Sequence, residues 1–281
     1  MKNMKKVLSL LAVALVFVQC STVPITGRQR VNFVSDAQIL PMSFQQYNGF
    51  LTENKSKVIT NTTQGRQLQE VGRNVSAAVD RFLKATGKAS EANSYKWEFN
   101  LIQDETINAW CMPGGKVVFY TGIMPICANT DGVAAVMGHE VAHAFAKHGQ
   151  ERMSKAQIQQ IGGAAVAIGT QNSQNAQLWN MAYGLGSTLG MLKYSRLHET
   201  EADRLGLVFM IMAGYRGEEA VNVWVRMQQR AQQSGAQKQP EFLSTHPHEA
   251  TRIADLKAYL PTAKKYEEQY NAMARKAGIT W

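Results

Sequence analysis

Long basic runs, internal repeats and membrane-length apolar stretches are all missing from this sequence. Lys and Arg outnumber Asp and Glu by 30 to 21, but they are scattered without an aromatic-basic repeat, which argues against a nucleic-acid site. The lack of repeats argues against a long helical array for partner binding. No linker stands out, so the 281 residues, 45% hydrophobic and 18% charged, suit an ordinary globular domain.

The N-terminus is typical of an export signal. Three lysines precede an apolar run over residues 7–18, which is too short to cross about 30 Å of hydrocarbon. The segment ending at Cys20 resembles a bacterial lipobox, although Gln19 is larger than the residue usual there. We predict a signal peptide over residues 1–19 and a lipid on Cys20 that attaches the chain to a membrane without spanning it. A plain secretory signal cut nearby is the alternative.

The mature chain divides into a tether and a domain. Residues 20–40 have few periodic apolar positions, so we read them as the lipidated N-terminus and tether, and residues 41–281 as the domain. Losing the three signal lysines lowers the net charge from +9 to 9 − 3 = +6, which weakly favours an anionic envelope surface. If Cys20 carries lipid, Cys111 and Cys127 remain, either as a disulfide or as two buried free thiols.

Apolar spacing in the first half predicts helices and a few strands. Positions three and four apart over residues 64–84 predict an amphipathic helix. Alternation over residues 95–101 predicts a strand, and residues 116–120 are a second strand candidate, with a turn signal at 112–115 between them.

The second half is expected to be helical. Thr130 and Asp131 are candidate caps of a helix that Gly149 would end. Residues 152–192 are interpreted as covering helices broken by glycines, with a mobile segment around residues 171–175. Further helices are expected over 194–213, 218–233, 248–260 and 263–276.

The segment from His139 to His143 carries the chemistry. These two histidines are four residues apart, so on a helix both imidazoles reach a single Zn²⁺ at roughly 2.0–2.1 Å. Glu140, about 100° further round the helix, reaches a water on the metal and acts as general base. The alternative is two solvated histidines on an exposed face. Apolar residues surround the motif, however, and buried histidines beside a Glu need a partner.

A second acidic segment offers the third ligand. Glu199 and Asp203 are four residues apart and share a helix face, whereas Glu201 is directed roughly to the opposite side. We assign Glu199 to the zinc and Asp203 to orienting a ligand histidine or the substrate. A charged, solvated helix start is the alternative.

Together these motifs resemble the M48 zinc metallopeptidases, the HtpX, Ste24 and Oma1 group, whose second motif is Glu-x-x-x-Asp. Residues 108–115 look like the stretch before that family's active-site helix, and residues 244–247 with 252–253 look like its C-terminal element. The similarity covers about residues 100–257. It is strongest to periplasmic lipoprotein members such as LoiP, YcaL and the BepA core, without the family's several transmembrane helices or the BepA repeat domain.

The resemblance implies an α+β, zincin-like (gluzincin) domain, mostly helical with a small mixed sheet, holding one Zn²⁺ per chain. It also implies that an edge strand pairs with an extended substrate, the alternative being an internal strand. That strand comprises Asn108, Ala109, Trp110, Cys111 and Met112.

Further roles are implied for several histidines. His246 would occupy the open zinc position and keep the enzyme inactive, the alternative being a capping or surface residue. His148, His198 and His248 are expected to be structural or solvated. The oxyanion stabiliser stays open among Tyr194, His246 and Arg252.

The expected function is hydrolysis of peptide bonds in misfolded or misassembled cell-envelope proteins by a zinc metalloendopeptidase. The protein would be a periplasm-facing lipoprotein of the bacterial outer membrane, with polypeptide substrates and no nucleic-acid partner. The substrate class rests on the resemblance alone. The alternatives are a zinc-stabilised envelope chaperone or assembly factor with a mostly silent peptidase, and a structural lipoprotein with a chance motif.

Overall fold

The computed structural model describes residues 20–32, 34–154, 194–234, 240–246 and 251–279. The predicted signal peptide, the mobile segment expected around residues 171–175 and His248 lie outside this part of the chain. No helix within these ranges is long and apolar enough to cross a membrane.

An N-terminal hairpin opens the described chain. Strand β1 (Cys20–Thr22) pairs antiparallel with β2 (Gln29–Val31), and helix α2 (Asp36–Glu53) follows. The turn between the strands contains Gly27 at φ 70°, a conformation that glycine adopts without strain. Residues 20–40, expected to be a tether, therefore contain two strands and the start of a helix. Strands of three residues are too short to show an apolar period, which is why the sequence pattern did not reveal them. Lipidation of Cys20 and the domain boundary at residue 41 stay predictions.

A mixed sheet of four strands lies at the centre of the described domain. Its strands are β3 (Val58–Ile59), β4 (Glu98–Ile102), β5 (Ala109–Met112) and β6 (Lys116–Tyr120), in the order β3-β4-β6-β5. Strand β4 runs parallel to β6, whereas β3 and β5 are antiparallel to their neighbours. The strand expected at 116–120 is confirmed in full, and β5 is an edge strand of this sheet.

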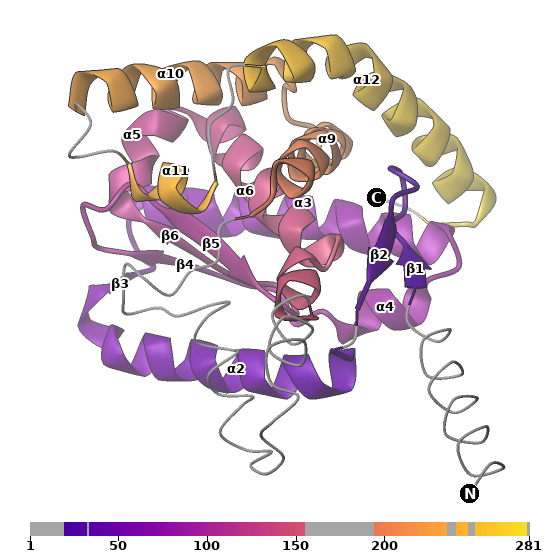
Figure 1. The fold of residues 1–281 in the computed structure, drawn as a ribbon, viewed down its shortest axis with the longest axis horizontal. Helices are drawn as coiled ribbons and strands as arrows, with labels where there is room; N and C mark the ends of the chain where they lie inside the picture. The colour runs from indigo at the N-terminus through magenta and orange to yellow at the C-terminus, as the bar shows by residue number, and fades with distance from the viewer. Residues whose placement is uncertain (1–19, 33, 155–193, 235–239, 247–250, 280–281) are drawn as a thin grey trace, which may run out of the picture.

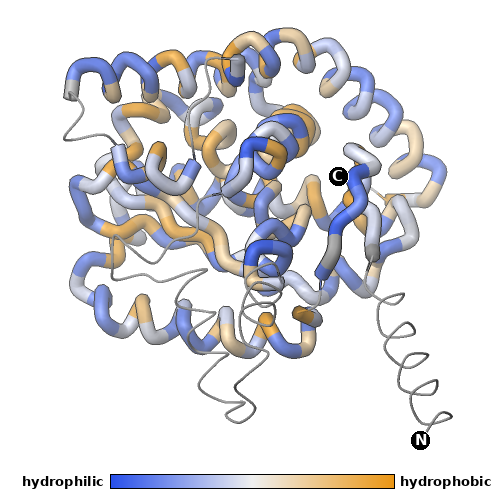
Figure 2. Tube along the Cα trace, in the orientation of Figure 1, coloured by the Kyte–Doolittle hydropathy of each residue, from blue (hydrophilic) through white to orange (hydrophobic). Residues whose placement is uncertain are grey.

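Helices cover both faces of the sheet (Figure 1). Successive strand residues point to opposite faces, so Val118 packs toward α2 while Val117 and Phe119 join the larger core on the other side. That larger core contains α3 (Thr63–Ala85) and α6 (Thr130–Phe145). Figure 2 shows hydrophobic residues along the central strands and alternating colours along α2, as expected for a helix with one buried face.

The remaining helices surround α6. Helix α9 (Arg196–Met212) lies against α6, and α10 (Glu218–Ser234) and α12 (Arg252–Lys276) lie outside them (Figure 1). The described fold also contains short helices: η1 (Lys55–Lys57), α4 (Ala89–Ser94), η2 (Thr121–Ile123), α5 (Met124–Cys127) and α11 (Glu241–Thr245). Residues 148–154 are helical as well. The result is the α+β, mostly helical architecture with a small mixed sheet that the sequence predicts.

Helices α12 and α6 differ in extent from the helices predicted there. The helices expected over 248–260 and 263–276 are one helix, α12, with Pro261 inside it. Pro261 is exposed, so water can satisfy the carbonyl group that loses its hydrogen bond. Helix α6 is capped by Asn129, whose side chain accepts a hydrogen bond from the backbone of Gly132, and it ends at Phe145, before Gly149.

Candidate metal centre

Two glycines let α6 and α9 cross at nearly backbone contact. A Cβ atom added at Gly138 would lie 2.6 Å from the carbonyl oxygen of Gly206, and one added at Gly206 would lie 2.7 Å from the backbone nitrogen of His139. Larger residues would hold the helices apart. The crossing therefore brings the acidic residues of α9 beside the histidines of α6.

The predicted metal ligands converge at this crossing. The Nε2 atoms of His139 and His143 are 3.1 Å apart, and the carboxylate oxygens of Glu199 lie 3.6 Å and 3.5 Å from them. In a tetrahedral zinc site with bonds near 2.0–2.1 Å, ligand atoms are about 3.3 Å apart. The three side chains thus have the mutual spacing of zinc ligands.

His246 provides a fourth candidate ligand atom. The ligand atoms of His139, His143, Glu199 and His246 all lie within 4.8 Å of one another. His246 caps the end of α11, its ring stacks on Phe242 at 4.3 Å, and its Nε2 atom is 3.6 Å from the carboxylate of Glu140. His246 is 2% exposed, so it is a buried residue of the centre and not a surface histidine.

Several polar atoms of the cluster need a partner. Glu199 Oε1, Glu140 Oε1 and His246 Nε2 are fully buried and accept or donate no hydrogen bond within the described residues. Burying such atoms unpaired costs several kcal/mol, on the order of 2–7 each. A cation between them satisfies Glu199 and His246 directly, and the residues present therefore fit a divalent metal ion.

Burial also shifts the protonation equilibria of the cluster. Burial raises the pKa of Glu199 to about 8, against the opposing effect of Arg252. Burial and then the charge of Glu199 raise the pKa of Glu140 well above its ordinary range. Burial therefore favours the protonated form of both carboxyl groups despite the nearby charge of Arg252, and a bound metal ion would favour their ionised form.

Asp203 orients the first histidine. Its Oδ1 atom lies 3.0 Å from Nδ1 of His139, and since an ionised carboxylate only accepts, Nδ1–H donates and Nε2 presents its lone pair to the cluster. Burial opposes ionisation of Asp203, but Arg252 and His139 lower its pKa below the ordinary value. The structure thus brings Asp203 to the position predicted from its spacing with Glu199.

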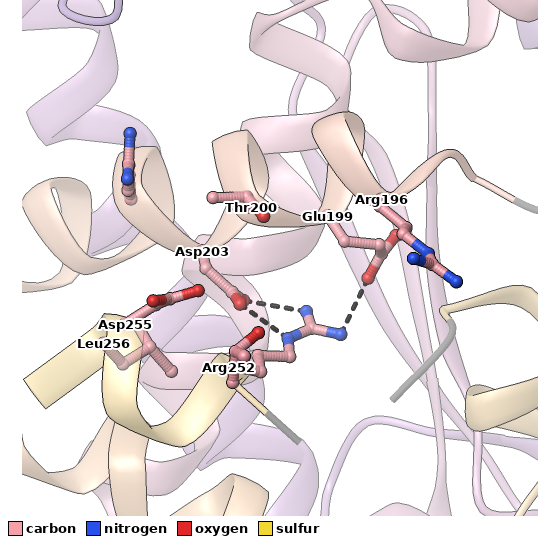
Figure 3. Close-up of a pocket in the computed structure, with 9 residues that line it drawn as sticks. Arg196, Glu199, Thr200, Asp203, Arg252, Asp255 and Leu256 are labelled. Atoms are coloured by element: carbon pink, nitrogen blue, oxygen red, sulfur yellow. Dashed lines mark hydrogen bonds and ion pairs between the residues drawn. The ribbon is translucent and has the colours of Figure 1, made fainter. Parts of the chain in front are cut away.

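Arg252 forms ion pairs with both Asp203 and Glu199 (Figure 3). Its guanidinium lies 2.5 and 2.8 Å from the oxygens of Asp203 and 2.8 Å from Oε2 of Glu199. It also lies over the ring of Trp224, 3.4 Å from the centroid. Because its donors are used by carboxylates, we assign Arg252 to positioning and not to the oxyanion role considered from the sequence.

Comparison with known proteins agrees with this geometry. The model of peptidase family M48 matches residues 69–260, a span that includes both motifs and Arg252. The chain belongs to peptidase family M48. A mitochondrial metalloendopeptidase OMA1 from Schizosaccharomyces pombe is 32% identical over 252 residues, covering 90% of this chain and 70% of that protein.

Two further relatives share shorter regions with this M48 chain. Mitochondrial metalloendopeptidase OMA1 from Saccharomyces cerevisiae is 38% identical over 182 residues, 62% of this chain and 50% of that protein. The beta-barrel assembly-enhancing protease of Escherichia coli K12 is 28% identical over 204 residues, 68% of this chain and 41% of that protein. The chain thus spans about half the length of these two relatives. The predicted family is confirmed, and with it the zincin-like class of the fold and the metalloprotease class of enzyme.

Strand β5 of this M48 chain borders the cluster. Tyr120 N–H donates to the carbonyl of Asn108, so by antiparallel alternation Ala109 and Cys111 direct their backbone groups away from β6, toward the open edge. The backbone of Cys111 hydrogen-bonds the carboxylate of Glu140. Trp110 and Met112 alternate with these positions and point their backbone groups toward β6. The edge therefore runs directly beside the candidate general base.

Other residues singled out from the sequence are buried among packing and hydrogen-bond partners. Asn108 is buried, and its amide donates to Glu241 at 3.2 Å. Cys111 and Cys127 are both buried free thiols, which selects one of the two alternatives left by the sequence. Tyr194 places its ring 3.8 Å from that of His143, and its backbone N–H donates to Thr245.

Sequence reasoning missed the roles of Gly138, Gly206 and Arg252. Both glycines lie inside segments with helical periodicity. A glycine in such a place often marks a close approach of two backbones, so the sequence did carry a signal for the helix crossing. Arg252 gives no local signal, since its carboxylate partners are 49 residues or more away.

Proposed function

We propose that this chain is a zinc-dependent metalloendopeptidase. The observation that carries the proposal is the buried cluster of ligand atoms from His139, His143 and Glu199 at zinc-like spacing, in which Oε1 of Glu199 has no hydrogen-bond partner among the described residues. Two imidazoles and a carboxylate form a donor set suited to zinc. When bound, one zinc ion per chain supplies Lewis-acid activation of a water molecule and of the scissile carbonyl.

The protein's own residues carry out the proton transfers. Glu140 accepts a proton from the attacking water, whose oxygen bonds to the carbonyl carbon, and then donates that proton to the leaving amine as the C–N bond breaks. Burial raises the pKa of Glu140, which favours its uptake of the proton from the water. Asp203 keeps the proton of His139 on Nδ1 throughout.

The position of strand β5 beside Glu140 favours an enzyme that cleaves polypeptides over one that acts on small molecules. The N–H groups of Ala109 and Cys111 already donate to Asn108 Oδ1 and to Glu140. An extended polypeptide lying along this edge would place its scissile bond beside Glu140, with its own amide groups facing the carbonyl groups of Ala109 and Cys111. Main-chain pairing of this kind gives affinity with little dependence on sequence, which suits unfolded chains as substrates.

The test is a matched pair of variants. Glu140→Gln should keep stoichiometric zinc but lose cleavage of an unfolded protein substrate, because the amide cannot accept the proton. Glu70→Gln, an exposed change on α3, is the control and should cleave like the wild type. Purified protein that takes up no zinc, or a Glu140→Gln variant that cleaves normally, would refute the proposal.

We infer that the substrates are misfolded or misassembled cell-envelope proteins and that a lipid on Cys20 anchors the enzyme, facing the periplasm, to the bacterial outer membrane. The basic and apolar start of the chain supports export, and the similarity to a protein named for beta-barrel assembly supports the substrate class. The mitochondrial relatives support neither location nor anchor. Cys20→Ala should move the protein from the membrane to the soluble envelope fraction; unchanged membrane association would exclude the anchor.

A self-inhibited resting state is favoured by the position of His246. Its Nε2 atom is close enough to the other ligand atoms to take the fourth metal position, which substrate or water needs for catalysis. His246→Ala should therefore raise the rate of peptide cleavage, while an unchanged or lower rate would exclude the inhibitory role.

The same contact favours a second candidate function, an envelope chaperone or assembly factor whose peptidase is usually silent. Complementation of an envelope defect separates the two functions. Full complementation by Glu140→Gln would assign the main role to assembly, and failure to complement would assign it to proteolysis.

A further inference from the structure

A buried hydrogen-bond chain leads from the second metal ligand to the N-terminal hairpin. Nδ1 of His143 lies 2.9 Å from Nδ1 of His148, and Nε2 of His148 lies 2.8 Å from Oε2 of Glu201. His148 is fully buried and Glu201 is 4% exposed, so water does not substitute for either contact. We refer to His148 and Glu201 as the relay.

The relay has one arrangement of protons that permits metal binding. For Nε2 of His143 to present a lone pair, its Nδ1 must carry the proton and donate to Nδ1 of His148. His148 then has its own proton on Nε2, where the carboxylate of Glu201 accepts it. The carboxylate thus selects the tautomer of His148, and His148 selects the tautomer of His143.

The hairpin holds the far end of the relay. Oε2 of Glu201 also accepts a hydrogen bond from Nε of Arg28 at 2.6 Å, and Oε1 accepts one from the hydroxyl of Thr26. Both residues belong to the segment between β1 and β2. Arg28 also pairs with Glu151 at 2.9 Å, so its guanidinium is held between two carboxylates. The orientation of Glu201 therefore depends on hairpin residues 173 and 175 positions away in the chain.

We propose that His148 and Glu201 are positioning residues for the metal ligand His143, and that Thr26 and Arg28 complete this support from the hairpin. The relay does for His143 what Asp203 does for His139: it fixes the tautomer and ring orientation of the ligand. The proposal rests on the proposed zinc site. Loss of such outer contacts typically lowers metal affinity about 10- to 100-fold.

Zinc affinity measured by competition with a chromophoric chelator is the direct test. His148→Phe keeps an aromatic ring that can stack on His198, which lies 4.3 Å away, but it removes both relay hydrogen bonds without changing the charge. Glu201→Gln keeps the shape and removes the carboxylate. Each should lower zinc affinity about 10- to 100-fold. The double variant should have the same zinc affinity as the single variant with the lower affinity, because both changes interrupt the same hydrogen-bond chain to His143.

Glu151→Gln is the matched control. It removes a buried carboxylate from the same partner, Arg28, but leaves the path from Glu201 to His143 intact. Its zinc affinity should equal that of the wild type, and Arg28→Gln should fall between the control and Glu201→Gln. Circular dichroism of the metal-free proteins checks that every variant compared has folded.

The outcomes distinguish a failure of the proposed zinc site from a failure of the relay. A wild type that binds no zinc overturns the proposed function. A wild type that binds zinc together with a folded His148→Phe of equal affinity overturns the relay, and so does a Glu151→Gln that binds as weakly as Glu201→Gln.

Nitrogen-15 spectra of the metal-free wild type test the proposal even if His148→Phe fails to fold. They should show the His143 proton on Nδ1 and the His148 proton on Nε2, and a His148 proton on Nδ1 would overturn it.

Discussion

Adding one methyl group at the crossing of α6 and α9 should disable the metal site more than it harms the fold. In Gly206→Ala the new Cβ atom would lie 2.7 Å from the backbone nitrogen of His139, whereas ordinary contacts begin at 3.4 Å. The helices must then separate by about 3.4 − 2.7 = 0.7 Å, because the obstacle is backbone and not a flexible side chain. Metal sites tolerate errors in ligand distance of about 0.2 Å, so a shift of this size displaces Glu199 and Asp203 beyond the tolerance.

The effect on stability is smaller because two contributions oppose each other. Overpacking costs about 1–3 kcal/mol, whereas replacing a mid-helix glycine by alanine stabilises a helix by about 0.5–1 kcal/mol. We therefore expect a net loss of about 0–2.5 kcal/mol in the unfolding free energy of the metal-free protein. Zinc affinity should fall by at least about tenfold.

Chelator competition measures the affinity, and urea unfolding of the metal-free protein measures the stability. Gly49→Ala in α2 is the control, since a Cβ atom there meets nothing within 4 Å. It should stabilise the fold by about 0.5–1 kcal/mol and leave zinc binding unchanged. A Gly206→Ala protein that binds zinc as tightly as the wild type would refute the idea that this close approach sets the ligand geometry.

Two substitutions test other parts of the centre, and thiol labelling tests the burial of the two cysteines. Asp203→Asn should lower zinc affinity about 10- to 100-fold in chelator competition, because the amide no longer fixes the proton on Nδ1 of His139; equal affinity would remove its positioning role. Arg252→Met should lower the unfolding free energy of the metal-free protein by about 3–5 kcal/mol in urea unfolding, because Asp203 and Glu199 stay buried without their cation. A loss below about 1 kcal/mol would show that these ion pairs contribute little to stability. Burial raises the pKa of Cys127 to about 12, so at pH 8 its thiol stays protonated and reacts slowly. A thiol reagent should label Cys111 and Cys127 in denatured but not in native protein, and rapid native labelling of either would contradict their burial.

Residues close together in sequence were predictable. His139 and His143 are four residues apart in one helix, as are Glu199 and Asp203, so helical periodicity alone places each pair on a common face, with Glu140 beside the first pair. The strand at residues 116–120 likewise follows from the short apolar run at residues 117–120, which comes soon after the turn signal at residues 112–115.

Contacts between distant elements were not predictable by the same means. The pairing of His148 with Glu201 and the crossing of Gly138 with Gly206 join segments 53 and more residues apart, and neither leaves a periodic trace. Glu201 was expected to be directed away from the site. It does lie on another side of α9, but that side faces the N-terminal hairpin, whose strands are too short to be recognised from their pattern.

The location of the metal ion tests the account most directly. Crystals of the protein with zinc, measured across the zinc absorption edge, should show one anomalous peak per chain. It should lie about 2.0–2.2 Å from Nε2 of His139, Nε2 of His143 and the carboxylate of Glu199. A peak bound elsewhere, or none at this cluster in stoichiometrically loaded protein, would contradict the account.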